Sequence, residues 1–299
     1  MPATQDFLVE IGTEELPPKS LKKLSDAFSN GIEKGLKDAG LNYDEAKSFA
    51  SPRRLALRIK GLETKQADKT VEKKGPSKKA AFDSEGQPSR ALLGFTKSLK
   101  IEPTQLEEQE TPKGTWLVYR STETGEETLS LLNAIVDQSL SKLPIPKRMR
   151  WGAQKVEFVR PLQWVLMIFG GEVVQGTILG IQNSNTTRGH RFHSSGEIQI
   201  NHADDYENSL LDQGKVIADY EVRKEKIRLS VQETAEQAGG VAVIDEDLLD
   251  EVASLNEWPV PLLGGFEERF LEVPTEALIS SMKEHQKYFH LLDKSGAMM

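Results

Sequence analysis

Residues 7–18 read FLVEIGTEELPP, and this stretch decides how the fold begins. Its first five residues, 7–11, are β-prone and are followed by Gly12, which indicates a short strand that ends in a turn. The pair Pro17-Pro18 stands where a helix would begin, because proline is tolerated in the first helical turn. We therefore expect a strand, a turn and then a helix that ends near Gly40.

Apolar periodicity extends this interpretation along the chain. The helix after Pro18 carries one apolar stripe at spacings of three and four residues, and the Gly170-Gly171 pair predicts a hairpin turn. Strands and helices mix without steady βαβ alternation, so the predicted class is α+β, with mixed or antiparallel sheets and packed helices in several domains. Further helices are predicted at residues 89–99, 129–143, 227–238, 248–255 and 278–282, and strands at 56–59, 116–119, 164–169, 173–181, 241–244 and 288–292.

Residues 63–88 differ in composition from their surroundings. Lysines accumulate there, apolar residues become sparse, and Gly75-Pro76 interrupts local order. Such a pattern is typical of a linker or exposed loop. We therefore predict an N-terminal α+β domain at residues 1–62, a lysine-rich linker or loop at 63–88, and a central α+β region at 89–299.

Composition narrows the class of protein. The 299 residues include no cysteine, which excludes disulfides, thiolate metal sites and a cysteine nucleophile. The chain starts without a basic segment followed by an apolar run, and the longest apolar run, Trp164 to Phe169, is too short to span a membrane. We therefore expect a cytoplasmic protein with no membrane contact.

Sequence motifs for catalysis are absent. Gly214-Lys215 is followed by valine and lacks the first glycine of a phosphate-binding loop, and no dinucleotide-binding, zinc-protease or nucleophile-elbow motif occurs. His190, His193 and His202 are close in sequence, but the arginines around them oppose binding of a dication. We therefore predict no catalytic residue and no metal site.

Three basic segments at predicted turns remain as candidate contact sites: residues 51–54, 144–151 and 188–192. Guanidinium groups suit phosphates, and aromatic faces stack on unpaired bases. The alternative is that these arginines pair with the many carboxylates of an acidic chain, whose net charge is −8. The candidate contact residues are Arg53, Arg54, Lys147, Arg148, Arg150, Trp151, Arg188, His190 and Arg191.

Several strings of this sequence resemble, in order, the start of the glycyl-tRNA synthetase β subunit of the bacterial heterotetrameric type. Each string alone is weak, but together they run collinearly over almost the whole chain. They include VEIGTEELPP at residues 9–18, SPRRLAL at 51–57, LPIPKRMRWG at 143–152, RGHRF at 188–192, GKVIADY at 214–220, EWP at 257–259 and QKYF at 286–289.

The resemblance implies a role in the ATP-dependent attachment of glycine to tRNA-Gly. It implies that the chain assembles with a catalytic α subunit in an α₂β₂ tetramer, and that the candidate residues contact tRNA or that subunit. It also implies that ATP and Mg²⁺ are used by the α subunit, that this portion binds no cofactor, and that it is inactive alone.

In that family the β subunit continues into an HD-type region and an anticodon-binding domain, so we expect an N-terminal portion here. Two alternatives stay open. One is a purely architectural region with no RNA contact, and the other is a vestigial domain resembling an aminoacyl-tRNA hydrolase.

Overall fold

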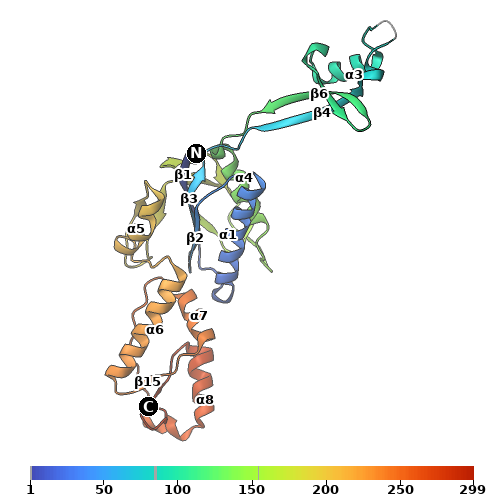
Figure 1. Ribbon diagram of the computed structural model, residues 1–299. Coiled ribbons are helices and arrows are strands. Elements are labelled where there is room, and N and C mark those ends of the chain that lie inside the picture. The colour runs from blue at the N-terminus through green and yellow to red at the C-terminus, as the bar shows by residue number, and fades with distance from the viewer. Residues whose placement is uncertain (1, 84–85, 154) are drawn as a thin grey trace. The chain divides into compact units, whose positions relative to one another are not determined.

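The computed structural model describes residues 2–83, 86–153 and 155–299 (Figure 1). The chain divides into two compact units, Met1–Thr64 with Thr128–Met299, and Lys65–Glu127. Both units combine helices with strands, and the sheets are mixed or antiparallel. The predicted α+β class is therefore confirmed.

The larger unit is built around one mixed sheet whose central strand is β1 (Thr4–Thr13). β1 pairs antiparallel with β3 (Arg54–Glu63) on one side and with β9 (Leu162–Phe169) on the other. The segment predicted to begin the fold thus lies at the centre of the sheet. The outer strands are β2 (Glu45–Ser51) beside β3, β12 (Ile181–Ser184) parallel to β9, β11 (Thr177–Ile178) beside β12, and β10 (Glu172–Val173) after the β9 hairpin.

The β9–β10 turn confirms the hairpin predicted from the glycine pair. Gly170 and Gly171 both have positive φ angles, of 58° and 88°. Two-residue hairpin turns of this kind require left-handed backbone at both central positions, which glycine adopts without steric cost. The strand after the turn is only two residues long, shorter than the predicted strand at 173–181.

Side chains of β1 alternate between two buried faces of the sheet. Phe7, Val9 and Ile11 belong to the core cluster formed with α1 (Leu21–Asp38) and α4 (Thr128–Ser141), which lie side by side in Figure 1. Leu8 belongs to a second cluster, on the face where α5 (Tyr206–Asp212) packs. Burial on both faces explains why residues 7–11 form a nearly continuous apolar run.

The C-terminal part of the larger unit consists mainly of helices. The predicted helices at 227–238 and 248–255 are confirmed as α6 and α7, and the aspartates Asp219 and Asp245 cap their N-termini by accepting backbone N–H bonds. The elements are α6 (Tyr220–Gln237), β15 (Val241–Ala242), α7 (Glu246–Leu255), η4 (Glu268–Glu272), α8 (Thr275–Ser280), the π-helix Ser281–Gln286 and β16 (Leu291–Leu292).

Shorter elements connect these helices to the sheet. In the described part of this unit, three small antiparallel ribbons lie outside the central sheet, formed by β7 and β8, by β13 and β14, and by β15 and β16. The remaining elements of the larger unit are η1 (Pro18–Ser20), β7 (Met149–Arg150), β8 (Glu157–Phe158), β13 (Thr186–Arg188), β14 (Glu197–Gln199) and η3 (Ala203–Asp205).

The smaller unit is a three-stranded antiparallel sheet with short helices. Its strand order is β4, β6, β5, and its small apolar core contains Ala81, Leu92 and Leu117. Ser89 caps the helix predicted at 89–99 by accepting a backbone N–H bond from Leu92. The elements are β4 (Lys69–Ser77), α2 (Lys78–Ala81), α3 (Arg90–Leu99), η2 (Pro103–Gln105), β5 (Glu107–Thr111) and β6 (Gly114–Glu123).

The structure corrects two parts of the predicted domain organisation. Residues 63–88 are not a linker or loop throughout, because β4 pairs with β6 along most of its length. This strand is largely exposed and is stabilised by backbone pairing and by the contact of Glu72 with Arg120 at 2.8 Å, so it lacks the apolar residues that mark a buried strand. The predicted region 89–299 is also divided: residues 1–62 share one unit with the part of the chain from Thr128 onward, because β9 pairs with β1 and α4 packs on α1.

A buried arginine holds α6 against its neighbours. Arg223 is fully buried, and its guanidinium donates to the carbonyl oxygens of Ala50 (2.8 Å), Ile217 (2.5 Å) and Ala253 (2.9 Å). These carbonyls belong to β2, the segment before α6, and α7. Burial lowers the pKa of Arg223 to about 10, so the group keeps its charge at neutral pH. One side chain therefore joins three segments through their backbone.

We expect Arg223→Met to lower the free energy of unfolding by about 3 kcal/mol, because three buried carbonyl groups lose a charged donor. The measurement is urea unfolding followed by circular dichroism. Arg228→Met on the same helix is the control, because Arg228 pairs with the exposed Glu246 and should change stability by less than about 1 kcal/mol. Equal losses of stability in the two variants would contradict the role of Arg223 in joining the three segments.

Candidate functional site

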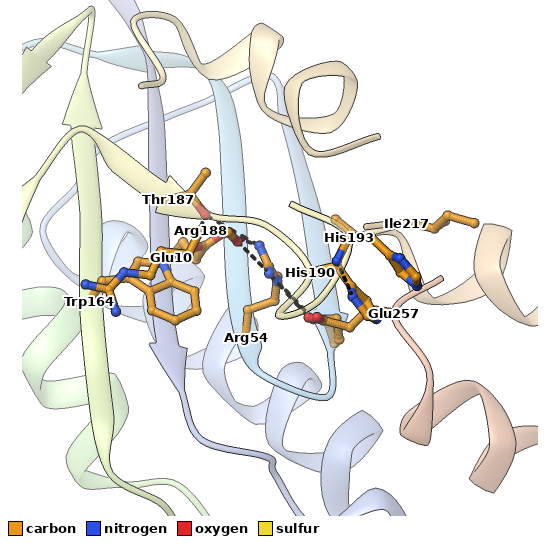
Figure 2. A network of polar contacts seen from close by, with 12 residues as sticks. Glu10, Arg54, Trp164, Thr187, Arg188, His190, His193, Ile217 and Glu257 are labelled. Carbon is orange, nitrogen blue, oxygen red and sulfur yellow. Dashed lines mark hydrogen bonds and ion pairs between the residues drawn. The ribbon is translucent and has the colours of Figure 1, made fainter. Parts of the chain in front are cut away.

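A buried polar network lies at the end of the central sheet. Arg54, the first residue of β3, is fully buried, and its Nη1 lies 3.4 Å from a carboxylate oxygen of Glu10. Its Nη2 lies 3.2 Å from Glu257 and donates to the carbonyl of Arg188 at 2.9 Å. Figure 2 shows Arg54 between Glu10 and Thr187 on one side and Glu257 on the other. The guanidinium is thus held by two carboxylates from distant parts of the chain.

Glu10 is the main acceptor of this network. Its carboxylate accepts hydrogen bonds from Trp164 Nε1, from the hydroxyl of Tyr206 and from Thr187 Oγ1, the last at 2.6 Å. Burial opposes the charge on Arg54, but Glu10 and Glu257 outweigh it and raise the pKa of Arg54 above its usual value. Burial, together with the Glu10 charge, raises the pKa of Tyr206 well above 10. Arg54 therefore keeps its charge, and Tyr206 keeps its phenolic proton, over the physiological range.

The local sequence explains why the network forms at this place. Glu10 lies on the face of β1 opposite to Val9 and Ile11, and Gly12 pairs with both Arg54 and Trp164 in the neighbouring strands. A Cβ atom on Gly12 would overlap the Trp164 indole, so only glycine lets this ring lie flat against β1. The indole then lies among three guanidinium groups. The Cζ atoms of Arg53, Arg54 and Arg188 are 5.5, 5.7 and 5.6 Å from the centroid of the Trp164 ring.

A small open pocket lies beside this network. Its volume is about 110 Å³, and it is bordered by the turn before β3, the loop after β13 and the segment after α7. Close backbone contact positions the loop: Gly189 lies against Gly214, and the His190 N–H donates to the Gly214 carbonyl at 2.7 Å. The lining residues are Glu15, Pro52, Arg53, His190, Arg191, Phe192, Leu255, Asn256, Glu257 and Trp258.

His190 is held as a neutral imidazole at the edge of this pocket. Its Nδ1 accepts the backbone N–H groups of Phe192 and His193, at 3.2 and 3.3 Å. A ring nitrogen that accepts hydrogen bonds carries no proton, so the proton of the neutral ring is on Nε2. Burial, with neighbouring cations, lowers the pKa of His190. His190 therefore offers one N–H donor at neutral pH.

The structure brings five of the nine predicted contact residues together: Arg53, Arg54, Arg188, His190 and Arg191 all border the network or the pocket. The prediction that Arg54 contacts a partner directly is wrong for this structure, because its side chain is fully enclosed by the protein. Arg191 is exposed and pairs with Glu14 at 2.6 Å, and Arg188 lies 3.5 Å from Glu197.

The other four predicted contact residues belong to residues 147–151, on and beside the β7–β8 ribbon. Lys147 is exposed, and Arg150 is exposed and pairs with Glu157 at 3.0 Å. Arg148 donates to the carbonyl of Ser141, and Trp151 packs partly against the main core cluster. Contact of these residues with tRNA or a subunit stays a prediction.

Sequence reasoning missed the acceptors that organise the site. Glu10, Glu257 and Tyr206 were not among the predicted residues, although their side chains surround Arg54. One signal was available: Glu10 is the only charged residue in the apolar run 7–11, and a charge inside a strand buried on both faces must be paired. Across residues 2–83, 86–153 and 155–299, no group of three histidines, aspartates or glutamates is arranged to hold a metal ion.

The sequence model of a known family, described as "Glycyl-tRNA synthetase beta subunit", matches residues 7–299. The chain belongs to the glycyl-tRNA synthetase beta subunit family. Proteins named glycine–tRNA ligase beta subunit from Marinobacter nauticus, Hahella chejuensis and Chromohalobacter salexigens are 59%, 55% and 51% identical to it. These matches cover 99% of this chain and 43% of each relative. The recognition made from the sequence strings is therefore confirmed.

Five of the strings that carry the family resemblance meet at this site. VEIGTEELPP supplies Glu10 and Gly12, SPRRLAL supplies Arg53 and Arg54, and EWP supplies Glu257. RGHRF supplies Gly189 and GKVIADY supplies Gly214, and these two glycines lie against each other where the loop after β13 meets the residues that follow α5. In this member of the β-subunit family, these five strings therefore have a shared structural explanation. None of the helices described is both long enough and apolar enough to cross a membrane.

We expect Glu10→Gln to lower the free energy of unfolding by about 3–5 kcal/mol, because Arg54 loses one of its two buried carboxylates. The glutamine amide would also bring an N–H group close to the donors of Trp164, Tyr206 and Thr187. Urea unfolding measures the change. Glu197→Gln, which neutralises the exposed partner of Arg188, is the control and should cost less than about 0.5 kcal/mol. A Glu10 variant as stable as this control would contradict the network.

The raised pKa of Tyr206 predicts a pH dependence. Above pH 10 the unfolded chain loses this phenolic proton while the folded chain keeps it, so the stability contribution is complete below pH 10 and falls as pH rises further. We expect Tyr206→Phe to show a shallower loss of stability between pH 10 and 11 than the unsubstituted chain. Thermal unfolding at several pH values measures it, and parallel curves for the two proteins would contradict the assignment.

Proposed function

We propose that this chain acts as part of a glycine–tRNA ligase, where it assembles with a catalytic α subunit and contacts tRNA-Gly. The observation that carries the proposal is the family match over residues 7–299 together with identities above one half to proteins of that name. Because the chain spans 43% of the length of those relatives, the activity of the whole enzyme is proposed here rather than assigned to this portion.

The proposal includes the division of labour between subunits. The α subunit would bind ATP and Mg²⁺ and activate glycine, in an α₂β₂ assembly in the cytoplasm. This chain would supply contact surface and no catalytic residue, so it would be inactive alone. The described side chains fit that role, since the charged groups around Arg54 are committed to one another.

Two surfaces have the chemistry for contact with RNA. On the β7–β8 ribbon, Lys147 and Arg150 are exposed, and the side chain of Arg150 is 65% accessible even though it pairs with Glu157. Exposed pairs of this kind contribute little to stability, so a phosphate can replace the carboxylate at low cost. Beside the pocket, Arg191 and the exposed ring of Phe192 lie next to each other in the chain.

An architectural function without RNA contact is the second candidate. The observation that favours it is the internal use of cationic groups: Arg54 and Arg223 are fully buried and bind groups of the protein itself. In this case the α subunit and the rest of the β subunit would be the only partners. The two candidates differ in what charge reversal on the ribbon does to tRNA binding.

We expect the chain to sediment with the α subunit and with tRNA-Gly, and its tRNA affinity to fall steeply with salt because phosphate neutralisation releases counterions. The triple variant Lys147→Glu, Arg148→Glu, Arg150→Glu should lower the slope of log affinity against log salt by roughly two to three. Analytical ultracentrifugation and fluorescence anisotropy measure these quantities.

A matched variant, Lys23→Glu, Lys34→Glu, Lys37→Glu, places the same charge change on the exposed surface of α1 and should bind tRNA more tightly than the ribbon variant. Equal binding by the two triple variants, with α-subunit assembly intact, would favour the architectural function. A chain that associates with neither the α subunit nor tRNA would refute the proposal.

A further inference from the structure

Arg53 is a buried cation whose guanidinium has no hydrogen-bond acceptor among the residues that the structure describes. Its residue surface is only 9% exposed, and its Nε is out of solvent without a hydrogen-bond partner. Among the described residues, no side-chain hydrogen bond or ion pair satisfies this group. Buried guanidinium groups are normally paired, because a desolvated and unbonded donor costs free energy. Its neighbour Arg54, by contrast, binds two carboxylates and a carbonyl group.

The guanidinium of Arg53 borders the pocket of about 110 Å³ described above. A cavity of this size holds several water molecules, so a phosphate group fits within it. His190 supplies a second donor to the same pocket, because its Nδ1 is already an acceptor and its proton is on Nε2. Two N–H donor groups from separate segments therefore border one small space.

Among the described residues, no carboxylate that lines the pocket makes a salt bridge with Arg53, although the charge of Glu257 attracts its guanidinium. Glu257 is bound by Arg54 at 3.2 Å and accepts a hydrogen bond from Ser51 at 2.8 Å. Glu15 is exposed at the rim, where water screens its charge. Within the described part of the chain, the N–H groups of Arg53 and His190 make no hydrogen bond to a protein acceptor, so both are available to donate to an oxyanion.

An exposed aromatic ring beside the pocket favours an RNA phosphate over a protein carboxylate as the bound anion. Phe192 is 84% exposed and borders the pocket. An RNA chain offers both groups at once, a phosphate for the guanidinium and an unpaired base for the ring. A carboxylate of a protein partner offers only the first of these.

We propose that this pocket binds one phosphate group of an RNA chain, with Arg53 and His190 as donors and Phe192 as the stacking surface for an adjacent unpaired base. The inference deepens the proposed function, on which it rests for the identity of the ligand as RNA. It also separates the two neighbouring arginines by role: Arg54 organises the site from within, and Arg53 contacts the ligand.

The first experiment tests the pocket without RNA. Inorganic phosphate should raise the melting temperature of the unsubstituted chain by about 2–4 °C relative to chloride at equal ionic strength, and should not stabilise Arg53→Met. Arg150→Met, which removes an exposed cation elsewhere, should respond to phosphate like the unsubstituted chain. No response to phosphate in any of these proteins would overturn the inference.

The same experiment tests whether Arg53 is merely structural. In chloride alone, Arg53→Met should melt at or above the temperature of the unsubstituted chain, because burial outweighs the attraction of Glu257 and Glu14 and disfavours the charge on Arg53. A melting temperature lower by more than about 5 °C would mean that Arg53 stabilises the fold through Trp164, and would overturn its assignment as a ligand contact.

The second experiment measures the affinity of the chain for a tRNA-Gly transcript by fluorescence anisotropy. We expect Arg53→Met to weaken binding about 10-fold and to lower the salt slope by roughly one, as the loss of one phosphate contact requires. Arg53→Lys should keep the salt slope, because it keeps the charge, but lose affinity with the guanidinium geometry. Phe192→Ala should weaken binding about 5-fold or more with an unchanged slope, because stacking neutralises no phosphate.

The outcomes separate this inference from the proposed function. If the unsubstituted chain binds the transcript and Arg53→Met binds it equally well, the inference fails while the proposed function stands. Stabilisation by phosphate with no effect of Arg53 on RNA affinity would mean an adventitious ion only. Loss of α-subunit association in Arg53→Met, with RNA affinity unchanged, would assign the pocket to a protein carboxylate and would also overturn the inference.

Discussion

The buried contact between Glu10 and Arg54 is the constraint on which the rest of the site depends. Both side chains are withdrawn from water at the end of a sheet that is covered on both faces, so each charge requires compensation inside the protein. Glu10 obtains it from Arg54, Trp164, Thr187 and Tyr206. A pair buried in this way contributes little net stability compared with apolar packing, but the loss of one partner is costly. Its main effect is to specify which segments meet.

The segments that the network joins are far apart in the chain. The network takes groups from β1, β3, β9, β13, α5 and the segment after α7. The pocket beside it is bordered by the turn before β3, the loop after β13 and the segment after α7. A rigid set of buried acceptors holds Arg54 and the backbone around it, which in turn places Arg53 and the loop of His190. The buried network around Arg54 therefore holds in place the surface around Arg53 and His190, where contact with RNA is proposed.

Local patterns predicted the parts of this structure that local physics controls. The apolar stripe of α1 appeared in the sequence because a helix packed on a sheet buries every third or fourth residue, and Leu24, Phe28 and Ile32 are all enclosed. β4 was not predicted, because it pairs through its backbone and leaves its lysines and Glu72 in water. Such a strand has no apolar signature, so its composition resembles that of a loop.

The sequence by itself determined the family, the α+β class and the cationic character of three turns, because these depend on residue order and on short-range periodicity. It could not distinguish Arg53 from Arg54, which are adjacent and chemically identical. Only the tertiary structure decided that Arg54 is enclosed between Glu10 and Glu257, while Arg53 borders a pocket and finds no hydrogen-bond acceptor among the described residues. The physical reason is that desolvation and pairing depend on groups more than a hundred residues away in the chain, such as Thr187 and Glu257, whose positions no local pattern encodes.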